Sequence, residues 1–151
     1  MRWLPMLTLW AMAAGFALPT EAATARIIKV LPHLLDREGR HALSPSLYER
    51  DAYQAFLRKN PDQCSGLRFD VQCKAKAADW SRLRLRMEVR GGKEAKPLVL
   101  EQPLRRNPRY HRWSSLTLDG ASYQKAGELI AWRATLWEGD KMLAQQKSFL
   151  W

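Results

Sequence analysis

The sequence predicts a mostly β protein, an antiparallel β-sandwich of about seven strands with one short helix inserted between the first and second strands. Two observations lead to this prediction. Apolar residues alternate with polar ones along several short segments, and Gly, Pro and Asp turn residues separate these segments. A strand with this alternation buries one face only, so we expect two such sheets to pack face to face around a core.

The first strand is expected within the apolar segment Ile27 to Leu35. Pro32 interrupts this segment, and because proline cannot donate to a sheet ladder, we place the strand at a sheet edge. The helix follows, since Ser46 and Glu49 have the spacing of a capping box, which satisfies the free amides of a first helical turn. An apolar stripe then continues to Asn60, where the following proline predicts the end of a helix of about three to four turns.

Six further strands are predicted after the helix. Their expected ranges are Leu67–Ala75, Leu83–Val89, Leu98–Leu100, Trp113–Leu118, Glu128–Trp137 and Lys141–Trp151. The short strand 98–100 has a proline on each side, which favours an edge position. The last two strands are expected to pair as a hairpin around Glu138-Gly139-Asp140.

Residues 1–25 have the layout of a secretory signal peptide, because Arg2 precedes an apolar stretch from Trp3 to Leu18 and a run of small residues. This stretch of 16 residues is shorter than the roughly 20 that a membrane-spanning helix needs. We therefore expect cleavage within Ala22 to Arg26 rather than anchoring. The expected product is one domain, residues 26–151, without a transmembrane span, in the periplasm or secreted into the medium.

The charge of the chain favours anionic partners. It has 25 Lys and Arg against 15 Asp and Glu, which gives a formal net charge of +10. For an exported protein, this charge suits an anionic glycan, a lipid head group or an acidic protein, and we expect no nucleic acid as partner. The alternative is a basic surface that serves only solubility. The oligomeric state stays open.

The most unusual cluster runs from Arg105 to Trp113, where four arginines stand among three aromatic or imidazole rings. Guanidinium groups bind phosphate or carboxylate through two parallel hydrogen bonds, so the cluster is interpreted as an anion-binding loop. Arginines on the solvent face of strand 83–89, and one on strand 128–137, are expected to extend it. The candidate binding residues are Arg105, Arg106, Arg109, Tyr110, Arg112, Arg82, Arg84, Arg86 and Arg133, with Arg90 in the same row. The alternative is a solvated loop beside an ordinary polar sheet face, with Trp113 in the core.

The sequence contains no strong catalytic or metal-binding motif. Its three histidines are scattered, and no serine lies in a Gly-x-Ser-x-Gly turn. We therefore expect no metal, no cofactor and no catalytic residue, and favour a non-enzymatic binding or accessory module. Two alternatives remain, a small envelope hydrolase acting on glycan or ester bonds and a structural subunit that pairs through edge strands.

The two cysteines, Cys64 and Cys73, are expected to stay unpaired. If 67–75 is one strand, extended chain separates their α carbons by about 30 Å, whereas a disulfide needs them within about 7 Å. We place Cys73 on an apolar strand face and Cys64 in a loop. A bridge is possible only if Cys64 folds back.

The stretch Asp119 to Tyr123 resembles the tyrosine corner of immunoglobulin-like domains, where a phenol fastens the crossing between sheets. This resemblance implies an immunoglobulin-like sandwich, although Lys125 stands where those domains have a cysteine. The stretches Leu31–Asp36, Ser46–Gln54 and Trp132–Trp151 are similar to a group of small exported bacterial proteins. That group has no assigned reaction or ligand, so the similarity implies export and a sandwich fold and assigns no functional residue.

Overall fold

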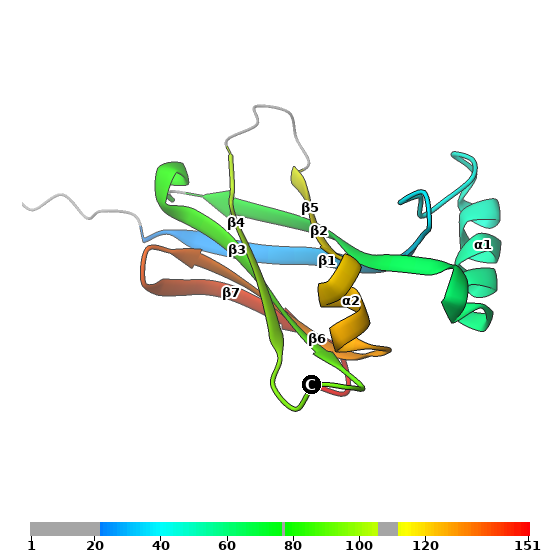
Figure 1. The fold of residues 1–151 in the computed structure, drawn as a ribbon. Coiled ribbons are helices and arrows are strands. Elements are labelled where there is room, and N and C mark those ends of the chain that lie inside the picture. The colour runs from blue at the N-terminus through cyan, green and yellow to red at the C-terminus, as the bar shows by residue number, and fades with distance from the viewer. Residues whose placement is uncertain (1–21, 77, 106–111) are drawn as a thin grey trace, which may run out of the picture.

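The structure is a computed structural model that describes residues 22–76, 78–105 and 112–151. Most of the predicted leader, residues 1–21, therefore lies outside the described residues. The described chain forms seven strands and two α-helices (Figure 1). The strands are β1 (Thr24–Asp36), β2 (Cys64–Lys76), β3 (Leu83–Gly91), β4 (Leu98–Pro103), β5 (Arg112–Asp119), β6 (Leu129–Glu138) and β7 (Lys141–Lys147). The helices are α1 (Leu47–Lys59) and α2 (Gly120–Ala126), with short 3-10 turns η1 (Pro61–Gln63) and η2 (Trp80–Arg82).

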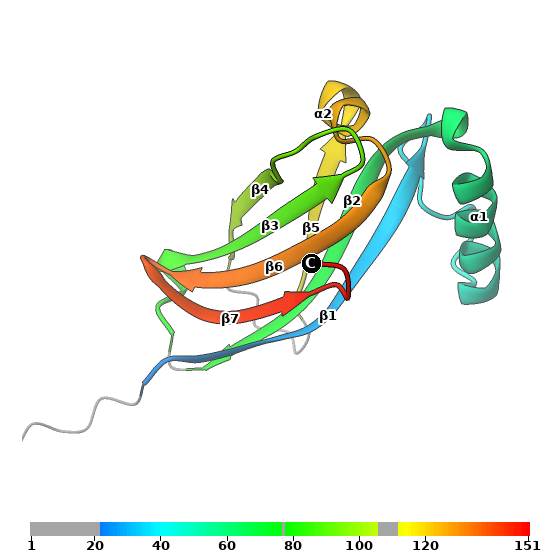
Figure 2. The ribbon, with the colours of Figure 1, turned by 90° about the horizontal axis from the view of Figure 1, so that it is seen from below.

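The strands form two antiparallel sheets. One has three strands in the order β1-β2-β5, and the other has four in the order β4-β3-β6-β7. Strand β1 lies against β7 and β4 lies against β5, so the two sheets approach each other along both pairs of edges (Figure 2). The predicted mostly β, two-sheet antiparallel architecture is confirmed, as are the edge positions of β1 and β4.

The core fills the space between the sheets and comes from the alternating apolar positions. On β2 and β3 these side chains are at most 3 % exposed, while the polar residues between them face outward. The buried set on these two strands is Leu67, Phe69, Val71, Cys73, Leu83, Leu85, Met87 and Val89. Trp132 of β6 is partly buried and packs against this core. A period of two in the sequence therefore locates the core directly.

Helix α1 begins as predicted, because the Ser46 side chain accepts a hydrogen bond from the Glu49 amide. The helix is fixed to the edge of β1 by one side chain. The Gln54 amide accepts from the Leu34 N–H at 2.8 Å and donates to the Leu34 carbonyl at 2.9 Å. It also donates to the His41 carbonyl at 2.8 Å. Gln54 thus satisfies backbone groups of β1 in the way that a neighbouring strand would.

The prediction of a lone helix is wrong. The sequence predicts one helix, between the first and second strands, but Gly120–Ala126 forms a second short helix, α2. Gly127, at φ 72°, ends it, and its amide bonds to the Tyr123 carbonyl. A left-handed φ of this kind is accessible to glycine without steric cost.

Several boundaries also differ from the prediction. Strand β1 begins at Thr24, before the expected Ile27, and Cys64 is the first residue of β2 rather than part of a loop. Strand β7 ends at Lys147, because the chain then turns back toward β6. Trp113 is 46 % exposed and so does not occupy the core.

Among the described helices, none is long and apolar enough to cross a membrane.

Candidate functional site

The solvent face of the four-stranded sheet collects basic side chains from three strands. Its arginines on β3 alternate with core residues, and antiparallel pairing brings β6 and β7 residues beside them. We term this surface the basic face. Its cations are Arg84, Arg86, Arg90, Arg133 and Lys147, and its carboxylates are Glu88 and Glu101. These described residues give the face an excess of three positive charges.

Both carboxylates of the basic face already have arginine partners. Glu88 accepts from Arg133 Nε at 2.6 Å and lies 3.7 Å from an Arg86 guanidinium nitrogen. Glu101 lies 2.9 Å from Arg84 Nη1. The hydrogen bond from Arg133 lowers the pKa of Glu88, and the same bond raises the pKa of Arg133. The ion pairs hold the guanidinium groups in fixed positions on the sheet.

An aromatic ring lies on one end of the basic face. The guanidinium carbons of Arg90 and Arg133 are 4.5 Å and 4.9 Å from the centroid of the Trp151 ring, the geometry of cation–π contacts. Ser148 holds the segment in place, since its amide donates to the Trp132 carbonyl at 2.9 Å. Its hydroxyl accepts from the Trp132 amide at 3.0 Å. Figure 2 shows the chain turning back toward β6 after β7.

The structure brings together only part of the predicted site. Arg84, Arg86 and Arg133 share the basic face, while Arg82 ends η2 just before β3 and points toward the Gly139 turn. Arg105 is exposed and lies two residues after the end of β4. Arg106, Arg109 and Tyr110 lie outside the described residues, and of Arg112 the backbone alone is described, as the first residue of β5 in the other sheet.

The sequence did not predict that Trp151 and Lys147 lie beside Arg90 and Arg133 on the basic face. The segment 141–151 was expected to continue as a strand, which would have carried Trp151 away from β3. A Ser-Phe-Leu interruption of the alternating pattern was the available signal that the strand ends early.

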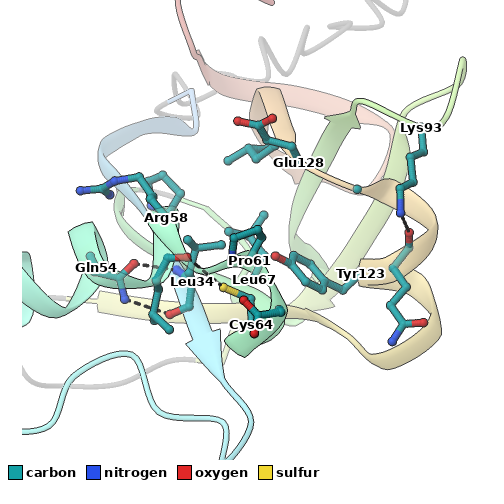
Figure 3. Close-up of a pocket in the computed structure, with 15 residues that line it drawn as sticks. Leu34, Gln54, Arg58, Pro61, Cys64, Leu67, Lys93, Tyr123 and Glu128 are labelled. Atoms are coloured by element: carbon teal, nitrogen blue, oxygen red, sulfur yellow. Dashed lines mark hydrogen bonds between the residues drawn. The ribbon is translucent and has the colours of Figure 1, made fainter.

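A separate pocket of about 690 Å³ opens between α1, α2 and the inner face of β1 and β2 (Figure 3). Its apolar lining includes Pro32, Leu34, Leu57, Leu67 and Leu129, and its charged residues are Arg58, Asp62, Lys93 and Glu128. The volume is in the range of small-molecule sites. None of the candidate binding residues lines this pocket.

Two hydrogen-bonded side chains lie in this pocket, Tyr123 of α2 and Cys64 of β2. Burial raises the pKa of Tyr123 to about 12, and it also raises the pKa of the Cys64 thiol. The protonated thiol points toward the Leu57 carbonyl at 3.5 Å. A thiol that stays protonated is a poor nucleophile, so this pair favours hydrogen bonding over covalent chemistry. Cys64 and Cys73 are both free thiols on the same strand.

A polar cluster on the outer face of the three-stranded sheet contains serine, histidine and aspartate. Asp70 lies 3.7 Å from His33 Nε2 and accepts from Ser115 Oγ at 2.5 Å and from Arg68 Nε at 2.8 Å. Burial lowers the pKa of His33. In a hydrolytic triad the serine donates to the histidine, whereas here both groups face the same carboxylate. This geometry differs from that of a hydrolytic triad. The described residues contain no group of three side chains arranged to hold a metal ion.

Comparisons of this chain with protein-family models, with curated proteins and with solved structures found no match. The functional conclusion therefore depends on the geometry and chemistry of the chain itself.

Proposed function

We propose that this protein is an exported, non-enzymatic binding or accessory module. Its basic face would hold an anionic component of the cell envelope or an acidic protein. The observation that carries the proposal is the concentration of five cations and two paired carboxylates on one rigid sheet face. Side chains that are already ordered lose little entropy when they bind, and guanidinium groups match phosphate and carboxylate geometry.

Export is proposed from the leader-like residues 1–25, with their single arginine, apolar stretch and small residues. A destination outside the cytoplasm fits a basic binding face, because anionic lipids and glycans are abundant polyanions at cell envelopes.

We also propose that the sandwich is immunoglobulin-like. The order β1-β2-β5 parallels strands A-B-E of such domains, and β3-β6-β7 parallels C-F-G, while β4 pairs with β3 instead of β5. Tyr123 lies in the β5–β6 connection, where the tyrosine corner of that fold is found. This fold assigns no activity, so the functional proposal depends on the basic face.

Binding is favoured over hydrolysis by the chemistry of the two other polar sites. The pocket places a protonated thiol and a phenol at its wall, and its lining includes neither serine nor histidine. The cluster around Asp70 lacks the serine-to-histidine hydrogen bond that would activate a nucleophile. The structural-subunit alternative is less favoured at β1, where Gln54 already bonds both backbone groups of Leu34.

The proposal is tested by retention on a heparin column, with heparin as the soluble polyanion. The variant R90Q/R133Q/K147Q removes three charges from the basic face. The control R26Q/K29Q/K74Q removes three exposed charges from the other sheet. We expect the basic-face variant to elute at clearly lower salt than the control, because clustered cations release several counterions together. Equal shifts for the two variants would show that bulk charge, not a site, determines retention.

A further inference from the structure

Two exposed hydrophobic side chains directly precede Trp151 at this end of the basic face. Leu150 is 64 % exposed and Phe149 is fully exposed. Phe149 and Leu150 occupy the turn between Ser148, which bonds to Trp132, and Trp151, which stacks on two arginines. The turn is therefore fixed at both of its ends. Two large apolar side chains project from a constrained segment of chain.

The surroundings of this turn are cationic. Lys147 directly precedes it, and pairing places Lys147 opposite Arg133 on β6. Arg90 reaches the same place from β3 through its contact with Trp151. The result is an apolar projection beside three cations, of which Arg133 is ion-paired with Glu88.

Exposed apolar side chains beside cations favour an anionic bilayer over a soluble polyanion as the partner. A soluble polyanion would contact the cations and leave Phe149 and Leu150 in water. An anionic bilayer offers phosphates for the cations and an acyl boundary for apolar side chains, which is how peripheral proteins attach to membrane surfaces. Each Lys or Arg near such a surface and each buried apolar group adds to the attachment.

We propose that this end of the basic face docks on an anionic lipid bilayer. Phe149 and Leu150 insert at the boundary between head groups and acyl chains, while Arg90, Arg133 and Lys147 contact lipid phosphates. We term these five residues the docking tip. The inference rests on the proposed function, of which it specifies the partner.

A second exposed apolar pair provides a matched control. Leu47 and Tyr48 at the start of α1 are 66 % and 84 % exposed. They precede Glu49 and Asp51, which are carboxylates that an anionic bilayer repels. If exposed apolar area alone caused vesicle binding, this pair would contribute as much as the docking tip.

The test is flotation of the processed, exported protein with phosphatidylcholine vesicles that contain phosphatidylglycerol. We expect F149S/L150S to weaken vesicle binding about tenfold or more, because it removes two large apolar side chains from the acyl boundary. The same variant should leave heparin retention unchanged, and L47S/Y48S should alter neither measurement. F149W should retain binding and show a blue-shifted fluorescence that brominated acyl chains quench.

Several outcomes would overturn the docking proposal. One is vesicle binding that F149S/L150S leaves unchanged, and another is equal binding to vesicles of pure phosphatidylcholine. A third is a concentration-dependent mass that F149S/L150S abolishes, which would identify a second copy of the chain as the occupant. Site-dependent heparin retention without vesicle binding would reject the bilayer and leave the proposed function standing. Equal heparin shifts for the basic-face and control variants would reject the proposed function itself.

Discussion

Asp36 is a buried carboxylate that holds the turn between β1 and α1. It is 3 % exposed, and its two oxygens accept four hydrogen bonds. The amides of Glu38 and Arg40 donate to Oδ1, and Arg40 Nε and the Tyr53 hydroxyl donate to Oδ2, at 2.7 to 2.9 Å. Burial alone would raise the pKa of Asp36. The hydrogen bonds, led by those from Arg40 and Tyr53, outweigh it and lower the pKa from 3.8 to about 2.

This depressed pKa predicts a specific loss of stability in acid. A carboxylate with a lower pKa in the folded state stabilises the fold fully above its unfolded value of 3.8. That contribution, about 2 kcal/mol, disappears as the pH falls from 3.8 toward about 2. Urea unfolding of the wild type and D36N at about pH 6 and about pH 2.5 measures it. The stability advantage of the wild type over D36N should shrink by about this amount in acid. An advantage that does not change with pH would contradict the account.

Among the elements, α1 was predictable because its signals are local. The capping box at Ser46 and the proline after Asn60 are read within one short window of sequence. Helix α2 was not predictable from the same signals. It has seven residues, too few for an apolar period, and Asp119 makes no side-chain capping bond. The hydrogen bonds between Gln54 and β1 were not predictable either, because Gln54 and Leu34 are 20 residues apart in the chain.

The packing of α2 against β3 predicts unequal effects for two neighbouring glycines. A Cβ on Gly91 would lie 2.0 Å from the backbone oxygen of Ala126, whereas the nearest atoms to a Cβ on Gly92 are 3.9 Å away. Backbone of α2 would have to move in G91A, so we expect a destabilisation of about 1–3 kcal/mol. G92A should change stability little. The thermal midpoints of the two variants measure the difference, and equal midpoints would mean that α2 does not approach β3 this closely.

For the whole molecule, the sequence predicted most arginines of the basic face but not the contribution of the C-terminal segment. Alternation along 83–90 put Arg84 and Arg86 on the solvent side of one strand, since a period of two separates the faces of a sheet. Arg133 lies opposite Glu88 although the two residues are 45 positions apart in the chain, and register cannot be read from a single segment. Trp151 reaches Arg90 only because the chain turns back after β7. The sequence therefore could not predict contacts between residues that are close in the fold but far apart in the chain.

The most direct test of the basic face adds charge instead of removing it. E88Q/E101Q removes both carboxylates from the face and preserves side-chain shape, while the control E38Q/E49Q removes two exposed carboxylates near α1. Both variants gain the same net charge. If the basic face is the binding site, E88Q/E101Q should elute from heparin at distinctly higher salt than E38Q/E49Q. Elution of the two variants at the same salt concentration would contradict a localised site.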